Sequence, residues 1–405
     1  MIPLEEARRQ ILAACPPLHP RAVPLTDALG CATSVAVTAD EAVPPFANTA
    51  VDGFAVRAAD VAGVPSTLEI VATLPAGADP AGLRVGEGQA IRIMTGAPVP
   101  EGADAVVMVE DTAVDGDKVT VARAVGAGSN VRAAAEDIAP GDVVFGPNTE
   151  LTAGHLGVLA SIGYQRVPVH PRVRVGVLST GDELVADGRP LRPGQIRDAN
   201  RPMLLALVDQ AGCDAVDLGL VADDEAAVAS VIQRGLAECD ALVTSGGVSM
   251  GDFDYVKVVL DRLGRMHWWQ IAIKPAKPLA FGLVGERPDG TGKPVFGLPG
   301  NPVSSLVSFE LFARPALRKM MGHQRIDRPR VRAIAAEPLR RRPDGKLHLV
   351  RVVASLEDDG RFHVRSSGGQ ASNLLRAMAL ANALALVPDG DGVQAGAEVE
   401  ALLLS

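Results

Sequence analysis

The sequence predicts a multidomain chain of the α/β plus β class, and three observations support this prediction. The 405 residues are enough for two to four domains of ordinary size. Hydrophobic residues make up 47% of the chain and charged residues 21%, which is typical of folded globular proteins and not of disordered chains. The hydrophobic pattern also changes twice, from short alternating runs to alternating strand and helix signals, and then back to short strands.

The first part of the chain predicts two helices on either side of an insertion. Apolar residues recur at helical spacing from Leu4 onward, and Thr152 can cap a second helix that Gly163 ends. We expect these two helices to pack side by side. The prediction is a discontinuous helical and linker domain made of residues 1–44 and 138–171.

Residues 45–137 have the pattern of an all-β insert. Short runs of apolar and β-branched residues alternate with turn dipeptides such as Asp115-Gly116. A small barrel or sandwich, inserted into the helical domain, is therefore predicted. Its strands are expected at Thr67–Leu74, Ala90–Met94, Ala105–Val109 and Lys118–Ala122.

Residues 172–323 alternate strands with helices, a pattern that predicts a parallel sheet covered by helices on both faces. Strands are expected at Val173–Leu178, Val216–Leu218, Ala241–Thr244 and Val295–Leu298, and helices at about 201–210, from Asp223 onward, 255–263 and 303–321.

Residues 324–405 return to short strand signals around one helix near 373–380. They predict a C-terminal β-barrel-like domain.

Charge and cysteine usage argue against several classes of protein. The net charge is −9 and no basic face is evident, so we expect no nucleic-acid partner; the densest basic run, Arg340 to Arg342, is predicted to be a solvated turn. No stretch approaches the roughly 18 apolar residues of a membrane helix, and acids stand near Met1 where an export signal has basic residues. We therefore expect a cytoplasmic protein without a membrane partner.

Four scattered cysteines and the lack of an HxxxH pair disfavour a zinc site.

Three loops that follow predicted parallel strands combine glycines with hydroxyl residues: Ser179–Glu183, Ser245–Asp252 and Gly297–Ser304. Ligands of parallel sheets bind where such strands end, and glycine-rich turns before helices suit phosphate groups. Any one of these loops could be an ordinary tight turn, but three on one sheet edge favour a nucleotide or phosphate site. Neither the P-loop nor the GxGxxG signature is present.

Acidic and basic residues stand in the same region. The acids Asp182, Glu183, Asp223, Asp224, Asp252 and Asp254 could hold Mg²⁺ together with phosphate. For Asp223 and Asp224 the alternative is a role at the start of the following helix. Lys274 and Lys277 are separated by Pro275, and this stiff spacing favours oxyanion binding over a free surface.

The β insert contains three further unusual segments. They are Asn48–Phe54, Arg92–Pro98 and Asn130–Asp137, which place an acid, a hydroxyl, and a cation with two acids near turns. Each segment alone is unremarkable.

Together these segments resemble the molybdopterin molybdenumtransferases of the MoeA type, which include the gephyrin E domain. The resemblance runs almost end to end and rests on eight motifs in order: Asn48–Phe54, Ile91–Pro100, Asn130–Asp137, Ser179–Leu184, Asp198–Arg201, Ser245–Asp254, Lys274–Pro278 and Gly297–Ser304. It implies a molybdopterin-binding-like α/β domain and an Mg²⁺-dependent enzyme that joins molybdate to the dithiolene of adenylated molybdopterin and releases AMP. It also implies an elongated homodimer whose cleft lies between the α/β domain of one subunit and the β insert of the other. Molybdopterin adenylyltransferase and molybdoenzymes are the expected transient partners.

The resemblance also implies site residues. On the insert side these are Asp52, Thr95, Arg132 and Asp137. On the α/β side the catalytic and metal-holding residues are Glu183, Asp223 and Asp254. Around the nucleotide and pterin it places Thr180, Asp182, Ser245, Gly246, Gly247 and Ser249. The oxyanion group is Lys274, Lys277, Ser304, Arg351 and Ser372, beside a loop shaped by Pro299 and Pro302. For Arg351 the alternative is an ordinary solvent-facing strand arginine.

The sequence departs from the family pattern in places. Alanines stand at 133–135, where relatives have basic residues and a glycine. Ala276 replaces the usual glycine between the two lysines, and Gln270 stands where some members have lysine. Two other classes are weighed against the transferase: a gephyrin-like scaffold, and the adenylyltransferase, which resembles only residues 172–322. The retained acids disfavour the first and the additional β domains disfavour the second.

Overall fold

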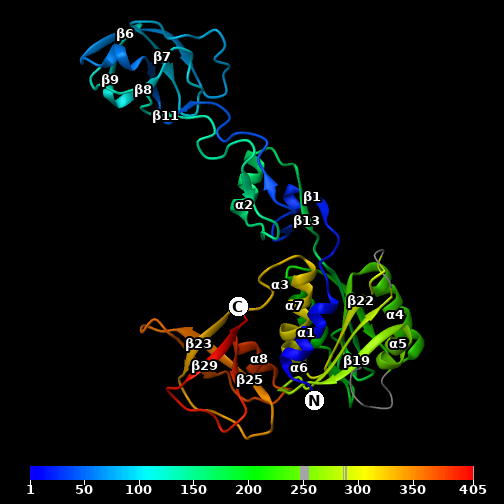
Figure 1. Cartoon of the computed structure of the whole chain (residues 1–405). Helices are drawn as coiled ribbons and strands as arrows, with labels where there is room; N and C mark the ends of the chain where they lie inside the picture. Colours follow the sequence, from blue (N-terminus) through cyan, green and yellow to red (C-terminus); the bar gives the residue numbers. More distant parts are fainter. Residues whose placement is uncertain (247–254, 286, 288–289, 405) are drawn as a thin grey trace.

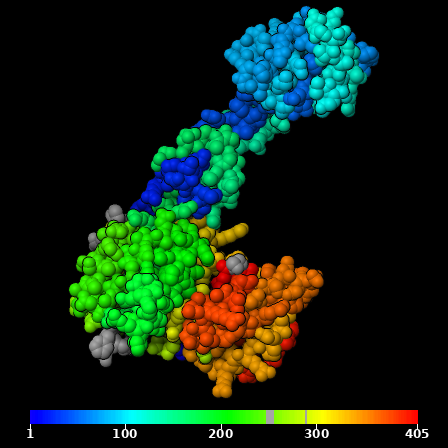
Figure 2. Space-filling model, turned by 180° about the vertical axis from the view of Figure 1, so that it is seen from behind, coloured from blue at the N-terminus to red at the C-terminus, as the bar shows by residue number. Residues whose placement is uncertain are grey.

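The structure is a computed structural model that describes residues 1–246, 255–285, 287 and 290–404. It consists of a two-lobed body and an arm, which we define as residues 21–170 (Figure 1). The arm projects away from the body in the space-filling view as well (Figure 2). No helix in these described ranges is long and apolar enough to span a membrane.

A six-stranded sheet forms the centre of the α/β lobe. Its strand order is β17-β14-β18-β22-β21-β19. The first four strands run parallel, so their carboxyl ends meet at one edge, as the sequence predicts. The strands are β14 (Arg174–Thr180), β17 (Asp214–Val221), β18 (Ala241–Ser245), β19 (Gly264–Gln270), β21 (Pro278–Val284) and β22 (Lys293–Leu298).

The antiparallel strands β19 and β21 extend the sheet and were not predicted. β19 is half-exposed along its length and its strand-favouring residues are limited to Trp268 and Trp269, while β21 contains both Pro278 and Gly282. Neither strand therefore carries a strong strand signal. Helices cover both faces of the sheet, as expected. They are α3 (Asn200–Gln210), α4 (Glu225–Glu238), α5 (Tyr255–Leu263), α6 (Pro302–Ser308) and α7 (Arg314–Met320).

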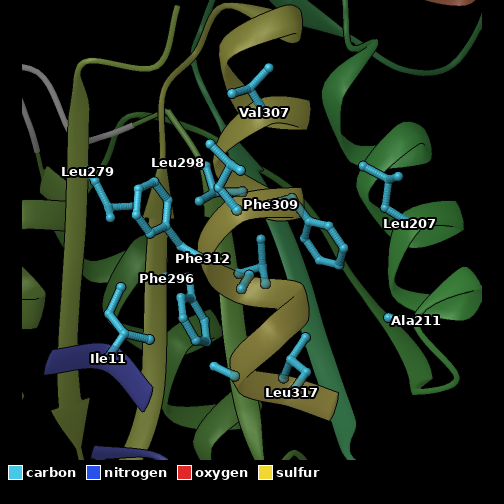
Figure 3. Close-up of a cluster of buried hydrophobic side chains, with 14 of the residues drawn as sticks. Ile11, Leu207, Ala211, Leu279, Phe296, Leu298, Val307, Phe309, Phe312 and Leu317 are labelled. Carbon is cyan, nitrogen blue, oxygen red and sulfur yellow. The ribbon is translucent and has the colours of Figure 1, made fainter. Parts of the chain in front are cut away.

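The predicted helix at 303–321 is continuous but contains a π-helical turn at Phe309–Ala313, between α6 and α7. Pro315 explains this turn, because proline has no N–H to donate to the carbonyl group four residues earlier. The carbonyl oxygen of Leu311 instead accepts a hydrogen bond from Arg8. Figure 3 shows the buried side chains of this helix between Phe296 of the sheet and Leu207 of α3.

The N-terminal helix α1 (Leu4–Ala14) packs on the body. Its residues Leu4 and Ile11 belong to the same buried cluster as Leu317 and Met320 of α7. The prediction that this helix packs beside the 153–161 helix is wrong. Arg8 and the apolar face of α1 contact the body directly, a tertiary preference that helical periodicity does not reveal.

The near part of the arm surrounds α2 (Ala153–Ser161), which has the expected capping interaction between Thr152 and His155. The rest of this part consists of short strands, which the predicted helical and linker domain did not include. The strands are β1 (Arg21–Pro24), β2 (Ala32–Thr33), β3 (Val37–Thr38), β12 (Val143–Phe145) and β13 (Arg166–His170).

The far part of the arm is a six-stranded sheet with the order β8-β5-β7-β6-β10-β9. Buried clusters lie on both of its faces, which is why its strands are rich in apolar residues. The four predicted strands agree with the observed ones to within one residue. The strands are β5 (Gly53–Val56), β6 (Ser66–Leu74), β7 (Gln89–Ile93), β8 (Ala105–Met108), β9 (Thr112–Asp115) and β10 (Lys118–Val121).

Two strands form the neck where the chain enters and leaves this far part: β4 (Asn48–Thr49) and β11 (Val131–Arg132) pair in an antiparallel fashion. Next to them, the N–H of Val43 donates to the carbonyl oxygen of Ile138 at 2.8 Å. The two chain segments therefore run side by side through the neck.

The C-terminal lobe is the predicted barrel. Five strands close into a ring because β25 pairs with both β26 and β27. Alanines and valines fill its interior, as suits a small barrel. The elements are β20 (Ile273–Lys274), which joins β25 from the α/β lobe, β23 (Arg330–Ala335), β25 (Leu347–Leu356), β26 (Phe362–Ser366), α8 (Leu375–Leu380), β27 (Ala383–Val387) and β29 (Glu398–Leu403), with the short pair β24 (Leu339–Arg340) and β28 (Gly392–Val393).

A buried ion network joins the two lobes. The Glu310 side chain is 1% exposed, and Arg328, in the segment leading to the barrel, binds its two carboxylate oxygens at 2.9 and 3.0 Å. Arg314 lies 3.8 Å from the same carboxylate. Burial, followed by the charge of Arg328, lowers the pKa of Arg314 to about 10. Glu310 is therefore the main countercharge of the buried Arg314 and the partly buried Arg328.

Candidate active site

A cavity of about 860 Å³ lies between the two lobes of the body. Lys274 and Lys277 reach it from the segment that connects the sheet to the barrel, and Ser304 reaches it from the first turn of α6. The N–H of Val303 donates to the carbonyl oxygen of Ser372 at 3.3 Å, which holds the Ser372 loop against this helix. The structure thus brings four of the predicted oxyanion residues to one cavity.

Arg351, the fifth predicted oxyanion residue, is buried behind this cavity. It is 2% exposed, so the alternative of a solvent-facing strand arginine is wrong. Its terminal nitrogens donate to the carbonyl oxygens of Gly369 (2.6 Å) and Ala371 (3.1 Å), while Nε finds no partner in the residues that the structure describes. Burial lowers the pKa of Arg351, and it forms no ion pair with any carboxylate among the described residues. The result is a buried cation without a countercharge, next to a loop that lines the cavity.

The basic run at 340–342 also lies at this cavity, and its prediction as a solvated turn is correct for Arg340 and Arg342 but wrong for Arg341. The Arg341 side chain is 1% exposed and donates to the carbonyl oxygens of Lys346 and Val387, which fixes the turn in place. Arg340 and Arg342 are exposed on the same wall. A local count of basic residues could not show that the barrel folds this turn against the lysine segment.

Asp344 is the one carboxylate among the described residues of this wall, and it is already paired. It lies 3.2 Å from Lys346 and 3.1 Å from His348. Desolvation raises the pKa of Asp344, but hydrogen bonds from His348 and Lys346 outweigh this effect and lower the pKa to about 2. The cavity therefore keeps an excess of positive charge, which suits an anion.

Two prolines shape the loop that leads into α6. Pro302 is the first helical residue, a position at which its missing N–H has no cost. The carbonyl oxygen of Pro299 accepts a hydrogen bond from Ser305. Neither proline lines the cavity in the described part of the chain.

A second group of predicted residues lies at the carboxyl edge of the parallel strands. Thr180 and Ser245 end the neighbouring strands β14 and β18 and are buried, and Gly246 follows with a φ of +89°. The N–H of Asp223 donates to Asp182 Oδ1 at 3.1 Å, and the N–H of Asp182 lies 3.4 Å from Asp223 Oδ2. Gly247, Ser249 and Asp254 lie outside the described residues.

The acidic side chains at this edge have the chemistry needed to bind a hard cation such as Mg²⁺. Asp182, Glu183 and Asp223 are exposed and make no ion pair with any described lysine or arginine. Carboxylate oxygens are the ligands that Mg²⁺ prefers. No group of three or more His, Cys, Asp or Glu residues arranged to hold a metal occurs within the described ranges. Asp224 has a different role, because its side chain accepts a hydrogen bond from Ala227 and caps α4.

Asn200 links two loops of this edge; sequence reasoning included it in the Asp198–Arg201 motif but assigned it no role of its own. Its Nδ2 donates to Ser245 Oγ at 2.7 Å and to the carbonyl oxygen of Gly300 at 2.6 Å. A polar residue at the start of a helix beside the Ser245 loop is a weak signal, because most such residues only cap the helix.

A third group lies at the neck end of the far sheet. The hydroxyl and the N–H of Thr95 both donate to Asp52 Oδ1, at 2.6 and 2.7 Å. These hydrogen bonds hold the pKa of Asp52 below its usual value. Gly53 allows β5 to approach β8 closely, since a Cβ there would lie 1.9 Å from the Val107 oxygen. Arg132, paired with Asn48 in the neck, is exposed at the same end.

Asp137 follows in the second neck segment, where its N–H donates to the carbonyl oxygen of Val43. The structure thus brings together the three unusual segments of the insert. It does not bring them to the two groups on the body, because the near part of the arm separates them within one chain (Figure 1).

Both alanine departures from the family pattern occur where the backbone favours glycine. Ala276 has a φ of +71° and Ala135 has a φ of +57°. In this left-handed region a Cβ contacts the backbone, and the strain is on the order of 1–2 kcal/mol. The lysine segment therefore keeps a turn suited to glycine although it carries alanine.

We expect Ala276→Gly to stabilise the body by about 0.5–1 kcal/mol, because relief of the left-handed strain exceeds the entropy cost of glycine. The midpoint of thermal unfolding, followed by circular dichroism, should rise by about 1–4 °C. Ala276→Val is the matched control and should lower the midpoint, since a β-branched residue tolerates positive φ poorly. Equal midpoints for all three proteins would contradict this account of the turn.

Three family models together match most of the chain. Residues 2–163 match the MoeA N-terminal region (domain I and II), residues 176–319 match a probable molybdopterin binding domain, and residues 332–404 match the MoeA C-terminal region (domain IV).

Individual relatives agree with these matches. A molybdopterin molybdenumtransferase of Haemophilus influenzae is 36% identical over 98% of both chains. Molybdopterin molybdenumtransferase 2 of Mycobacterium tuberculosis is 39% identical over 94% of this chain and 93% of the relative. Among solved structures, a molybdopterin biosynthesis moeA protein of Pyrococcus horikoshii covers 100% of both chains with a TM-score of 0.78 and 29% identity.

Proposed function

The chain belongs to the MoeA family of molybdopterin molybdenumtransferases, and from this premise we propose that it joins molybdate to the dithiolene of adenylated molybdopterin and releases AMP. It is thus a transferase of molybdenum cofactor biosynthesis. In the proposed reaction two Mo–S bonds form, and one molybdate oxygen leaves as water with the two thiol protons. A second water cleaves the phosphoric anhydride and AMP departs.

The observation that supports this proposal best is the uncompensated cation Arg351. A tetrahedral dianion is costly to desolvate unless charged or polar donors surround it. The cavity offers two lysines, and the described part of the chain supplies no carboxylate to neutralise Arg351. Ser304 and Ser372 add adjustable hydroxyl donors. We place molybdate among Lys274, Lys277, Ser304, Arg351 and Ser372.

The pterin nucleotide is placed at the carboxyl edge of the parallel strands, around Thr180, Asp182, Ser245, Gly246, Gly247 and Ser249. Glu183, Asp223 and Asp254 would hold Mg²⁺, which supplies neutralisation of phosphate charge when bound. Thr180 and Ser245 are buried at this edge and can orient the phosphates with their hydroxyl and backbone groups.

The insert residues Asp52, Thr95, Arg132 and Asp137 complete the proposed site only if a second subunit contributes them. Within one chain they lie at the far part of the arm, away from the body (Figure 1). We therefore propose a homodimer in which the arm of each subunit reaches the body of its partner. A cytoplasmic location and transient contacts with the adenylyltransferase and with molybdoenzymes are part of the same proposal.

The test of the proposed function is AMP release from adenylated molybdopterin with and without molybdate, and with Mg²⁺ removed by a chelator. We expect release to depend on both ions. Release of AMP without any molybdate dependence would reject insertion as the reaction. Release that is unchanged after chelation would reject the role of Mg²⁺.

A mixture of Asp52→Ala and Asp223→Ala subunits should recover activity that neither variant has alone. In a heterodimer one cleft carries both lesions and the other carries none. With random exchange we expect about a quarter of the wild-type rate. The measurement is AMP release after subunit exchange, which is verified with two affinity tags. No recovery in a verified heterodimer would place both residues in the cleft of one subunit.

A further inference from the structure

Asn200, at the first position of α3, does not use its side chain to cap its own helix. The N–H of Arg201, next in the chain, donates to Asp198 Oδ1 at 3.1 Å, so Asp198 performs that task. The Asn200 side chain is free to bind elsewhere although it is 9% exposed.

The Asn200 amide nitrogen connects two loops that are far apart in the sequence. It donates to Ser245 Oγ at the end of β18 and to the carbonyl oxygen of Gly300 between β22 and α6. β18 and β22 are neighbouring parallel strands. One planar amide therefore fixes the separation of two loops that border the edge where the nucleotide is placed.

The carbonyl oxygen of the same amide, Oδ1, is buried and has no hydrogen-bond partner among the described residues. The hydroxyl of Thr244, the residue before Ser245 on β18, is also buried and lacks a partner within the described part of the chain. A buried amide oxygen without a hydrogen-bond donor costs free energy. Because this oxygen lies at the edge where the nucleotide is placed, a ligand that donates a hydrogen bond to it would remove that cost.

We propose that Asn200 is a positioning and recognition residue of the nucleotide edge. Its amide nitrogen holds the two loops in place, and its carbonyl oxygen accepts a hydrogen bond from an N–H or O–H group of the adenylated pterin. This inference rests on the proposed function, since it names a contact for the substrate of that reaction.

The experiment titrates adenylated molybdopterin and AMP, without molybdate, into the full-length protein by calorimetry. Asn200→Ala should weaken binding of adenylated molybdopterin at least tenfold, because both loop contacts and the acceptor are lost. KM for adenylated molybdopterin should rise by a similar factor, while kcat at saturating substrate changes less than threefold. Asn382→Ala is the matched control. Its amide also makes two hydrogen bonds, but both go to Ala354 in the barrel, so it should leave the affinity unchanged.

Asn200→Asp provides a second measurement that preserves side-chain volume. A carboxylate lacks the amide donors and repels the phosphates, so binding should be weaker than for Asn200→Ala at pH 8. A protonated carboxyl group offers a donor and an acceptor like the amide. Binding by this variant should therefore recover as the pH is lowered to 5.5, relative to the wild type under the same conditions.

Affinities within twofold of wild type for both Asn200 variants would overturn this inference and leave the proposed function intact. A pH response of Asn200→Asp that matches the wild type would overturn the recognition by the side chain. If the wild-type protein bound neither ligand, the proposed function would fail together with the inference.

Discussion

Arg351→Ala is expected to raise the molybdate concentration needed for half-maximal AMP release by roughly ten- to a hundredfold. The variant loses the buried cation of the oxyanion group, and charge-assisted hydrogen bonds are worth about 1.5–3 kcal/mol. It also loses the hydrogen bonds that hold Gly369 and Ala371, so the Ser372 loop should loosen. The measurement is AMP release across a molybdate titration at saturating adenylated pterin.

Two comparisons make this result specific. Arg351→Lys keeps the charge but not the forked donors, so its molybdate response should lie between those of alanine and wild type. Calorimetric binding of the adenylated pterin alone should stay within about threefold of wild type for every Arg351 variant. Equal losses for both ligands would instead indicate that Arg351 only supports the fold.

Glu310→Ala is expected to destabilise the body by about 3–5 kcal/mol, which is the usual cost of leaving buried charges without their partner. Arg328 loses both carboxylate contacts, and Arg314 loses its nearest countercharge. Because the network joins the two lobes, the barrel should separate from the α/β lobe at lower temperature. Thermal unfolding followed by tryptophan fluorescence reports on the α/β lobe through Trp268 and Trp269 of β19.

The control for Glu310 is an exposed pair in the same lobe. Glu225 and Arg262 form a salt bridge whose side chains are 41% and 66% exposed. Exposed ion pairs contribute about 0–1 kcal/mol, so Glu225→Ala should barely move the unfolding midpoint. If both variants lost stability equally, the buried network would have no special role in joining the lobes.

Local patterns in the sequence predicted the elements whose burial follows chain periodicity. Four of the six strands of the far sheet agree to within one residue, because these segments are apolar and bounded by turns. The four parallel strands of the body are in the predicted places, but their ends differ from the prediction by up to three residues. Strand β19 was missed because it lies at the sheet edge, half-exposed, where no pattern is required. The partner of α1 was misjudged because helical spacing shows which face is buried but not what covers it.

The candidate site shows the same contrast between features that local sequence patterns predict and features that depend on how distant segments pack. Lys274, Lys277, Ser304 and Ser372 meet at one cavity, as the family resemblance implied. The sequence did not show that Arg340 and Arg342 line this cavity, because only the folded barrel brings their turn to the lysine segment. The positive φ of Ala276 was equally hidden, since alanine carries no sequence signal for a left-handed turn.

The neck of the arm affects how easily the far sheet can be removed from the chain or exchanged. The two segments that enter and leave the far sheet are hydrogen-bonded to each other, as in the pairs Val131 with Thr49 and Val43 with Ile138. A domain whose ends are adjacent can be removed, exchanged or grafted without redirecting the chain on either side. We therefore expect the far sheet to be exchangeable as a unit. If it is removed, a short turn can connect Pro44 to Asp137, which are adjacent in the neck. The removed segment keeps the paired strands β4 and β11 at its two ends. Exchange at the two neck segments can therefore replace the far sheet while the body stays unchanged.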